Sequence, residues 1–335
     1  MRIAVDAMGG DHAPREIIRG IAAGLRFLGD ADELHIFGPR ARVEAECREL
    51  DLADPRVRFT DCTQIIQMDD KAVEAVRTKR DSGIVRMATA AGRGEVDAVI
   101  SAGNTGAFVA ACQLRVGTIP GVTRPGIAVV MPTFHGPVLI CDVGANVDPK
   151  PHHLFDYARM CACYARAILK IENPRVGVVS IGEEEAKGNE LIREARALIK
   201  QDSRLNFVGN AEGRDIFAGG FDIFICDGFV GNVILKLSEG LAEGLCRTII
   251  NEIEQESVAL SAQFKPIVQN VWRKHDFAEY GGAPLLGLNS VAIICHGRSD
   301  QRAISNAIRV AVEEHRLELN RIIAAQLAPP QEAPA

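Results

Sequence analysis

The sequence lacks the features that define several large classes of protein. Lys and Arg number 38 against 44 Asp and Glu, and the formal net charge of −6 excludes a chain-wide affinity for nucleic acid or an anionic membrane. No apolar run approaches the ~20 residues that a helix needs to span a bilayer. No long apolar signal region follows Met1, so export is not expected. We therefore expect a cytoplasmic protein that binds no nucleic acid.

Motifs for metals, nucleotides and serine catalysis are also missing. The nine cysteines follow no zinc-ligand spacing, and Cys161 and Cys163 are two residues apart in a predicted helix, so neither a metal site nor a disulfide framework is indicated. The loop at 103–106 has the wrong spacing for a dinucleotide fingerprint or a Walker A loop. No G-x-S-x-G nucleophile elbow is present. We expect no cofactor and no metal.

What the sequence does contain is a regular alternation of short strands and longer helices. Hydrophobic residues make up 47% and charged residues 24%, which is typical of a globular protein. Such alternation predicts an α/β three-layer sandwich with a mainly parallel sheet. Strands are expected at 2–6, 33–37, 57–61, 98–101, 176–180, 221–226 and 290–295. Residues 127–131 and 138–141 predict a hairpin, because the connection between them is short, and therefore a mixed sheet.

Amphipathic patterns place the helices between these strands. They are expected at 14–28, 42–50, 71–80, 152–169, 189–200, 232–254 and 299–323. No linker divides the chain before the polar tail, so we expect a single catalytic domain over 1–325 and a flexible tail over 326–335. A helical excursion at about 236–280 is expected to contact a second subunit or a membrane.

Three predicted strand ends share small residues and an asparagine. In open α/β sheets, ligands bind at the carboxyl ends of strands. Glycine lets backbone N–H groups approach an anion, a helix N-terminus adds partial positive charge, and an amide can donate a hydrogen bond. A phosphate site is therefore predicted, with tight turns and helix caps as the alternative. The candidates are Ser101, Gly103, Asn104, Thr105, Gly106, Asp142, Gly144, Asn146, Asp227, Gly228, Gly231 and Asn232.

Two further loops carry charged candidates. The loop after the first strand contains Asp6, Gly9, Gly10 and His12, and its histidine is a candidate base or anion ligand, or an exposed residue near a helix cap. Lys187 follows three glutamates at 183–185, so it either reaches an anion in the cleft or pairs with those acids. The glutamates leave Mg²⁺ binding as an alternative, although acids are common in the first turn of a helix.

Taken together, the stretches 6–14, 101–107, 142–146, 182–189 and 227–232 resemble the bacterial phosphate acyltransferases of phospholipid synthesis. The resemblance extends from residue 1 to about residue 323. It implies a fold like those of isocitrate and isopropylmalate dehydrogenases and of phosphotransacetylases. It also implies a homodimer at the inner face of the plasma membrane.

The resemblance further implies the reaction. A long-chain acyl group would pass from an acyl carrier protein thioester to inorganic phosphate, with Lys187, Asn232 and His12 as catalytic residues. The acyl phosphate would then serve a membrane acyl-phosphate:glycerol-3-phosphate acyltransferase. Phosphate is already anionic, so it can attack the carbonyl without a strong base, and we expect direct transfer. Cys141 or Cys226 is the rival nucleophile, although their apolar strands suggest inert thiols.

Two surfaces are candidates for partners. Arg77, Lys79 and Arg80, or the pair at 273–274, would suit an acidic carrier protein. The apolar stripe from Leu260 to Trp272 would suit a membrane, a core or a dimer contact, although Pro266 should kink or break that helix. Alternative functions are a dehydrogenase, a phosphotransacetylase that uses coenzyme A, and a non-enzymatic scaffold.

Overall fold

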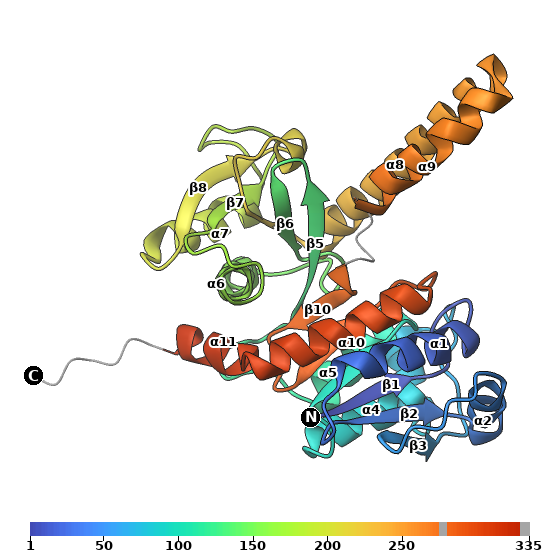
Figure 1. Ribbon diagram of the computed structural model, residues 1–335. Helices are drawn as coiled ribbons and strands as arrows, with labels where there is room; N and C mark the ends of the chain where they lie inside the picture. Colours follow the sequence, from blue (N-terminus) through green and yellow to red (C-terminus); the bar gives the residue numbers. More distant parts are fainter. Residues whose placement is uncertain (275–279, 329–335) are drawn as a thin grey trace, which may run out of the picture.

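The computed structural model describes residues 1–274 and 280–328. Trp272, Arg273 and Lys274 are described for their helical backbone only, so the basic pair at 273–274 and the end of the apolar stripe lie outside the described side chains. The chain forms one eleven-stranded mixed sheet with helices on both faces (Figure 1). The predicted α/β class with a mainly parallel, mixed sheet is confirmed.

The strands are β1 (Arg2–Asp6), β2 (Glu33–Gly38), β3 (Val57–Asp61), β4 (Ala98–Ser101), β5 (Gly126–Thr133), β6 (Gly136–Cys141), β7 (Arg175–Val179), β8 (Asn206–Ala211), β9 (Ile223–Ile225), β10 (Ala283–Leu286) and β11 (Val291–Ile294). The helices are α1 (Arg15–Gly24), α2 (Arg40–Glu49), α3 (Ala72–Thr78), α4 (Gly83–Gly92), α5 (Thr105–Arg115), α6 (Pro151–Ala167), α7 (Glu190–Gln201), α8 (Gly228–Glu256), α9 (Val258–Lys274), α10 (Gln301–Arg316) and α11 (Leu319–Leu327). Short 3₁₀ turns, Leu25–Phe27 and Gly213–Phe217, follow α1 and β8.

The strands of the sheet follow the order β3-β2-β1-β4-β11-β10-β5-β6-β9-β7-β8, and those of the two halves run in opposite directions. Strands β1 to β4 and β11 run parallel, β10 and β5 each reverse the direction, and β6 runs antiparallel to β5. The halves are offset, because Ile294 lies level with Ser101 and opposite Ala283, whereas Ile127 lies opposite Leu285. The carboxyl ends of oppositely running strands therefore meet near the middle of the sheet.

Alternate residues of each central strand pack against opposite layers, as the pleat requires. In β1, Ile3 and Val5 join the core under α1 and α10, whereas Ala4 joins the core under α4 and α5. The second half has its own core around α6, in which Tyr157 and Tyr164 are fully buried. Each half of the sheet is thus covered on both faces.

The structure contains four elements that the sequence analysis did not expect. Strand β8 lies at the edge of the sheet and contains Gly209 in the left-handed region, at φ +140°. Strand β10 has only four residues and follows two glycines with positive φ. Helices α4 and α5 are rich in Ala and Gly and have buried residues on several sides, so a simple amphipathic pattern does not reveal them.

The C-terminal helix also differs from its prediction. The segment 299–323 forms two helices, because Glu318 adopts φ +52° between α10 and α11. Helix α11 extends to Leu327, whose side chain is buried in the core of the second half. This helix therefore occupies the first two positions of the segment expected to be a tail, and residues 329–335 lie outside the described part.

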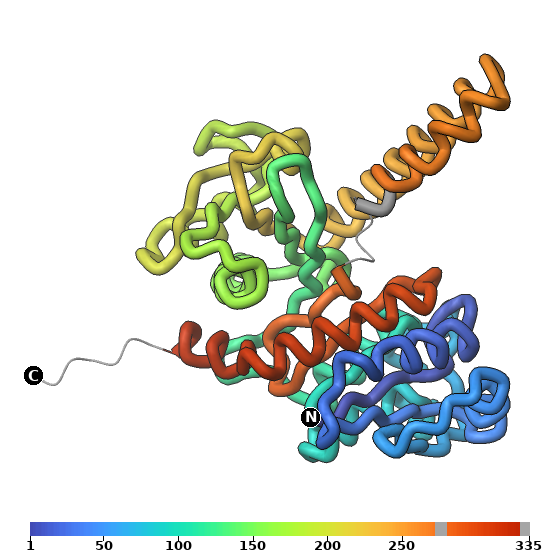
Figure 2. Tube along the Cα trace, in the orientation of Figure 1, coloured from blue at the N-terminus to red at the C-terminus, as the bar shows by residue number. Residues whose placement is uncertain are grey.

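Helices α8 and α9 form an arm that projects from the body, as both views show (Figures 1 and 2). Of the 29 residues of α8, only Gly228 and Gly231 are buried. Of the two predicted effects of Pro266, a kink or a break, the break does not occur, because Pro266 lies inside α9 and the helix continues on both sides of it. Within the described residues, none of the helices has the length and hydrophobicity needed to cross a membrane.

The contact between α1 and α10 depends on a glycine. A Cβ atom at Gly20 would lie 2.4 Å from Cβ of Ile304 and 2.9 Å from the carbonyl oxygen of Gln301. We predict that Gly20→Ala lowers the free energy of unfolding by about 1–3 kcal/mol, because the helices must move apart. The Gly220→Ala variant is the control, since nothing lies within 4 Å of its added Cβ. Equal urea midpoints for both variants would contradict the close packing.

Candidate active site

The predicted residues Asp6, Ser101 and Gly103 form a hydrogen-bonded cluster at the carboxyl ends of β1 and β4. This cluster is called the buried frame below. Ser101 Oγ donates to Asp6 Oδ2 at 3.0 Å and accepts from the backbone N–H of Gly103, also at 3.0 Å. Gly9 is required by this contact, because its Cβ atom would lie 2.5 Å from the Gly103 nitrogen. Burial raises the pKa of Asp6 to about 6, against the opposing effect of the Ser101 hydrogen bond. These residues support the cleft from behind.

The loop after β11 is fastened to this frame. The backbone N–H of Cys295 donates to the Ser101 carbonyl oxygen at 2.8 Å, and the N–H of Asp11 donates to the Gly297 carbonyl oxygen at 2.8 Å. Gly10 permits the second contact by adopting φ +102°. The loop at 295–298 is thereby held over the end of β4, although the sequence analysis assigned it no role.

Asn104 uses both ends of its amide within the protein. Its Oδ1 caps α5 by accepting from the Ala107 N–H at 3.0 Å. Its Nδ2 donates to the carbonyl oxygens of Met68 at 3.1 Å and of Asp70 at 2.9 Å. Asn104 therefore positions the loop that carries Met68, instead of offering its amide to a ligand.

The N-terminus of α5 remains open beside Asn104. Within residues 1–274 and 280–328, the backbone N–H groups of Thr105 and Gly106 and the Thr105 hydroxyl have no hydrogen-bond partner. Thr105 is exposed to the cleft. The first turn of an α-helix carries a partial positive charge. This turn can therefore accept an anion.

In the second half, the buried Asp142 organises the loop that follows β6. Its carboxylate accepts backbone N–H groups from Ile127 at 3.0 Å, Gly144 at 3.2 Å, Ala145 at 3.0 Å and Asn146 at 2.6 Å. Burial raises the pKa of Asp142 to about 6, while the four hydrogen bonds act in the opposite direction. The residue is fully buried and serves the architecture of the loop.

Helix α8 begins directly against this loop. The Gly228 N–H donates to the Asn146 carbonyl oxygen at 2.8 Å, and a Cβ at Gly231 would lie 2.0 Å from the Asp142 carbonyl oxygen. Asp227 Oδ1 caps the helix by accepting from the N–H groups of residues 229 and 230, each at 2.9 Å. The N-terminus of α8 is therefore already occupied by a carboxylate, unlike that of α5.

Asn146 is also used internally. Its Nδ2 donates to the Tyr157 hydroxyl oxygen at 2.7 Å and to the Pro125 carbonyl oxygen at 2.8 Å. Asn232, one turn into α8, differs, because its side chain has no hydrogen-bond partner among the described residues and faces the cleft.

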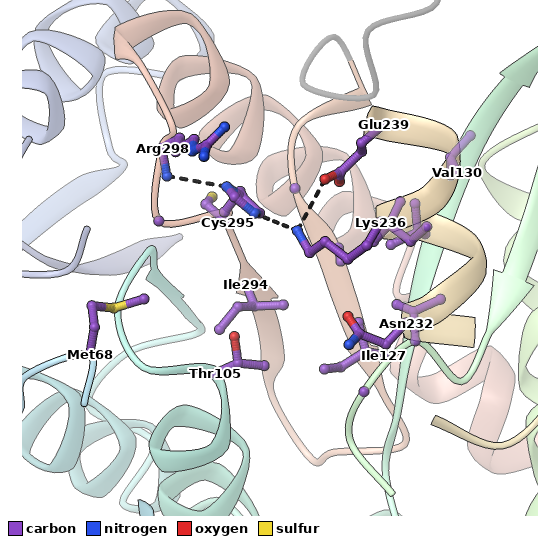
Figure 3. A pocket seen from close by; sticks show the side chains of 18 of the residues that line it. Met68, Thr105, Ile127, Val130, Asn232, Lys236, Glu239, Ile294, Cys295 and Arg298 are labelled. Carbon is purple, nitrogen blue, oxygen red and sulfur yellow. Dashed lines mark hydrogen bonds and ion pairs between the residues drawn. The ribbon is translucent and has the colours of Figure 1, made fainter. Parts of the chain in front are cut away.

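The two halves enclose a cleft of about 410 Å³. Figure 3 shows Thr105 and Asn232 on opposite sides of it, with Ile127 and Ile294 nearby. The remaining lining residues are Asp11, Met68, Val129, Val130, Val143, Gly144, Leu235, Lys236, Glu239, Gly282, Ala283, Cys295, His296, Gly297 and Arg298. An apolar floor with a few polar groups at its sides is typical of a small-molecule site.

The polar end of the cleft contains residues that the sequence analysis missed. Lys236 Nζ lies 3.1 Å from Glu239 Oε2 and 2.5 Å from His296 Nε2. Burial lowers the pKa of His296, and the positive charge of Lys236 lowers it further. Lys236 follows Asn232 by four residues, which places both on one face of α8. This spacing could have identified Lys236 from the sequence.

Of the predicted site residues, Thr105, Gly144 and Asn232 line the cleft. Most of the others form its supporting frame. Lys187 does not line it: this exposed residue follows β7, a strand that pairs with β9. His12 is exposed beside Asp11 and does not line the cleft either.

Two alternative chemistries find little support in the geometry. Glu183 pairs with Arg214 and Glu185 with Lys200, and the described residues contain no group of three His, Cys, Asp or Glu side chains that could hold a metal. Cys141 and Cys226 are buried, and burial raises the pKa of both thiols well above the ordinary value. A thiolate nucleophile at either position is therefore unfavourable.

The fold is that of the phosphotransacetylases. The chain superimposes on a phosphotransacetylase from Streptococcus pyogenes with a TM-score of 0.63 and 18% identity, covering 94% of each chain. A phosphotransacetylase from Staphylococcus aureus gives a TM-score of 0.61 at 14% identity, again covering 94% of both chains. At such low identity, these similarities define the fold class alone.

Sequence comparison identifies the family within that fold class. The model of the family described as "Fatty acid synthesis protein" matches residues 1–321. A phosphate acyltransferase from Desulfitobacterium hafniense is 45% identical, over 97% of this chain and 100% of its own length. Another, from Geotalea daltonii, is 44% identical over 96% of this chain and 92% of its own. The chain belongs to this fatty acid synthesis family, and the resemblance to phosphate acyltransferases is confirmed.

The raised pKa of Asp6 predicts a pH effect on stability. Between about pH 4 and 6, the folded protein keeps a proton on Asp6 that the unfolded chain has lost, so the stabilising effect of this proton is lost as the pH rises. We predict that Asp6→Asn gains stability relative to the original chain between pH 4 and 7, by up to ~3 kcal/mol. Urea unfolding at each pH measures the difference. Parallel stability curves for the two proteins would contradict the prediction.

Proposed function

We propose that this protein transfers a long-chain fatty acyl group from an acyl carrier protein thioester to inorganic phosphate, forming acyl phosphate for phospholipid synthesis. Family membership and relatives named phosphate acyltransferase support this function. The observation that carries it is the cleft in which the open N-terminus of α5 faces the free amide of Asn232 across an apolar floor.

The phosphate binds at the first turn of α5. The N–H groups of Thr105 and Gly106 and the Thr105 hydroxyl offer three donors to one anion, and the helix dipole adds partial positive charge. The N-terminus of α8 is a poorer choice, because Asp227 already occupies its N–H groups and would repel an anion. For this reason we assign the phosphate to the loop at 101–106 and not to the loop at 227–232.

The thioester lies between the phosphate and Asn232. A phosphate oxygen attacks the carbonyl carbon, the C–S bond breaks, and the sulfur leaves as a thiolate with the bonding electron pair. Asn232 donates a hydrogen bond to the carbonyl oxygen as negative charge develops on it. Positioning the two reactants supplies the rest of the rate enhancement, and no acyl-enzyme is formed.

The apolar floor receives the methylene groups next to the thioester. Ile127, Val129 and Ile294 line this part of the cleft and come from the central strands β5 and β11. Contact with apolar side chains removes methylene groups from water, which stabilises the bound state by about 0.8 kcal/mol per buried CH₂. The floor therefore favours an acyl chain over a short acetyl group.

An acidic carrier protein docks next to the cleft, on basic side chains at and just beyond the C-terminal end of α3. Arg77 and Arg80 are exposed at the end of this helix, and Lys79 pairs with Asp70 at 2.5 Å. Asp70 belongs to the loop that Asn104 positions and that carries Met68 to the cleft wall. The basic surface is thus connected directly to the cleft, although the chain as a whole is negative.

The arm supports a homodimer and peripheral contact with the inner face of the membrane. Helix α8 exposes an apolar stripe with a spacing of four residues: Phe229, Val233, Leu237, Leu241, Leu245 and Ile249. Helix α9 exposes Leu260, Phe264, Ile267 and Val271. Such stripes are covered in the assembled protein. Membrane contact would deliver acyl phosphate to a membrane acyl-phosphate:glycerol-3-phosphate acyltransferase.

The amide of Asn232 provides the main test of the proposed function. We predict that Asn232→Ala lowers kcat by about 10²–10³-fold, the range for loss of one oxyanion donor. The assay follows free carrier thiol and hydroxylamine-trapped acyl phosphate, with palmitoyl acyl carrier protein and phosphate as substrates. Asn251→Ala is the matched control, because this exposed asparagine lies farther along α8, outside the cleft.

Absence of any phosphate-dependent product with the original chain would exclude the transferase and favour the dehydrogenase or scaffold alternatives. Lys187→Ala and His12→Ala belong in the same assay, since both residues are predicted to be catalytic but do not line the cleft. If a variant is as active as the original chain, the residue that it replaces has no catalytic role.

The α8 stripe predicts the oligomeric state. We expect the chain to sediment as two copies of 36.2 kDa each, and Leu241→Glu to sediment as a single copy, because a buried carboxylate opposes the apolar contact. Arg247→Glu is the control for charge on the same helix, where Arg247 pairs with Glu243. Sedimentation of the original chain as a single copy would contradict the dimer.

A further inference from the structure

At the polar end of the cleft, a lysine ammonium is held in place with one of its hydrogens unused. Lys236 lies one turn after Asn232 on α8, and its Nζ is 2.5 Å from His296 Nε2 and 3.1 Å from Glu239 Oε2 (Figure 3). An ammonium has three donors and no acceptor. One N–H group of Lys236 therefore has no partner among the described residues, and it can donate to a ligand in the cleft.

The neighbours of Lys236 fix the position of its nitrogen. Because an ammonium cannot accept, Nε2 of His296 accepts this short hydrogen bond, and the Arg298 N–H lies farther from the ring, at 3.2 Å from Nδ1. Burial lowers the pKa of His296, and the charge of Lys236 lowers it further, which keeps the ring neutral. The carboxylate of Glu239 accepts from the opposite side. The unused N–H group is thus held beside Asn232.

The groups on the thioester carbon differ in the surroundings that suit them. The proposed function places the carbonyl oxygen at Asn232 and the methylene groups on the apolar floor that includes Ile127 and Ile294. Contact with the charged side chains of Lys236 and Glu239 is unfavourable for methylene groups, but it suits a sulfur atom that develops negative charge. The sulfur therefore points to the polar end of the cleft.

The polar end also lies toward the surface on which the carrier protein is proposed to dock. The side chain of Lys236 is 45% exposed, and His296 and Arg298 are exposed as well. A Cβ atom at Gly297 would lie 3.2 Å from Cε of Met68, so the loop at 295–298 contacts the segment that leads into α3. The linker between the sulfur and the carrier can leave the cleft on this side without crossing the apolar floor.

The departing sulfur needs a donor that the other polar groups do not provide. When the C–S bond breaks, the sulfur becomes a thiolate, and an alkyl thiol has a pKa of about 8.5, so the thiolate takes up a proton at neutral pH. The α5 N-terminus binds the phosphate and Asn232 binds the carbonyl oxygen in the proposed reaction. Lys236 is the cation next to Asn232 on the same helical face.

We propose that Lys236 is a further catalytic residue, which donates its unused N–H group to the departing sulfur and then transfers a proton to the thiolate. This inference rests on the proposed function and adds the group that assists the leaving thiol. The C–S electron pair stays on sulfur, and an S–H bond forms as an N–H bond of Lys236 breaks. The amine regains a proton from water, into which the phosphate group releases its own. Glu239 and His296 are positioning residues that hold Nζ beside the sulfur.

The test follows turnover of palmitoyl acyl carrier protein and phosphate by the full chain. We expect Lys236→Ala to lower kcat by about 10–100-fold, the loss for one hydrogen bond to a charged group. The KM for phosphate should stay unchanged, because the thioester separates Lys236 from the phosphate. Ethylammonium added to the assay should raise the kcat of this variant several-fold, since it returns the missing donor. Lys200→Ala is the matched control, because Lys200 pairs with Glu185 on the outer surface.

The Asn232→Ala variant separates a lost donor at the sulfur from general damage to the cleft, because ethylammonium cannot replace an amide at the carbonyl oxygen. If ethylammonium leaves the kcat of Lys236→Ala unchanged, or raises that of Asn232→Ala equally, the assigned role of Lys236 is wrong and the transferase stands. The same conclusion follows if Lys236→Ala turns over as fast as the original chain. If the original chain releases no thiol in response to phosphate, both the inference and the proposed function fail.

Discussion

The buried carboxylate of Asp142 holds together the part of the molecule on which the cleft depends. A carboxylate that leaves water loses a large solvation energy unless hydrogen bonds replace it, and here four backbone N–H groups do so. The acceptor contacts fix the end of β6 against β5 and shape the loop at 143–146. Because Gly228 and Gly231 pack directly on that loop, the same interaction sets the direction of α8 and of the whole arm.

Some residues of the glycine and asparagine loops form internal hydrogen bonds, and others line the cleft. Asn104, Asn146 and Asp227 satisfy backbone groups or neighbouring side chains within the protein. The side chains of their neighbours Thr105 and Asn232 have no hydrogen-bond partner in the part of the chain that the structure describes, and both face the cleft. A polar residue in such a loop is therefore assigned to a ligand only after its internal hydrogen bonds have been counted.

The proposed binding of an anion and an acidic partner to a chain of net charge −6 depends on local geometry. The α5 N-terminus and Lys236 concentrate positive charge inside a partly apolar cleft, where it is screened less than on the open surface. Arg77 in α3 and Arg80 just after this helix are exposed. Two acids, Asp11 and Glu239, also line the cleft, and Glu239 contacts Lys236.

The amino-acid sequence by itself determined the class of fold, most strands and helices, the family, and the glycine and asparagine loops around the cleft. The fold class and its elements depend on short-range patterns: apolar residues at alternating or helical spacing, and glycines at turns. The family was indicated by the resemblance of five stretches of sequence to phosphate acyltransferases. Short or edge strands such as β10 and β8 were not predicted, because their stability comes from neighbours distant in sequence.

Only the tertiary structure decided which residues of those loops face the cleft. The strands of the two halves of the sheet run in opposite directions, so their carboxyl ends come together near its middle. No local sequence pattern encodes this arrangement. Lys236 and His296 are 60 residues apart in sequence, and they meet because β11 pairs beside β4 while α8 starts on the Asp142 loop. Contacts of this kind depend on packing between distant segments, which propensity and spacing along the chain do not specify.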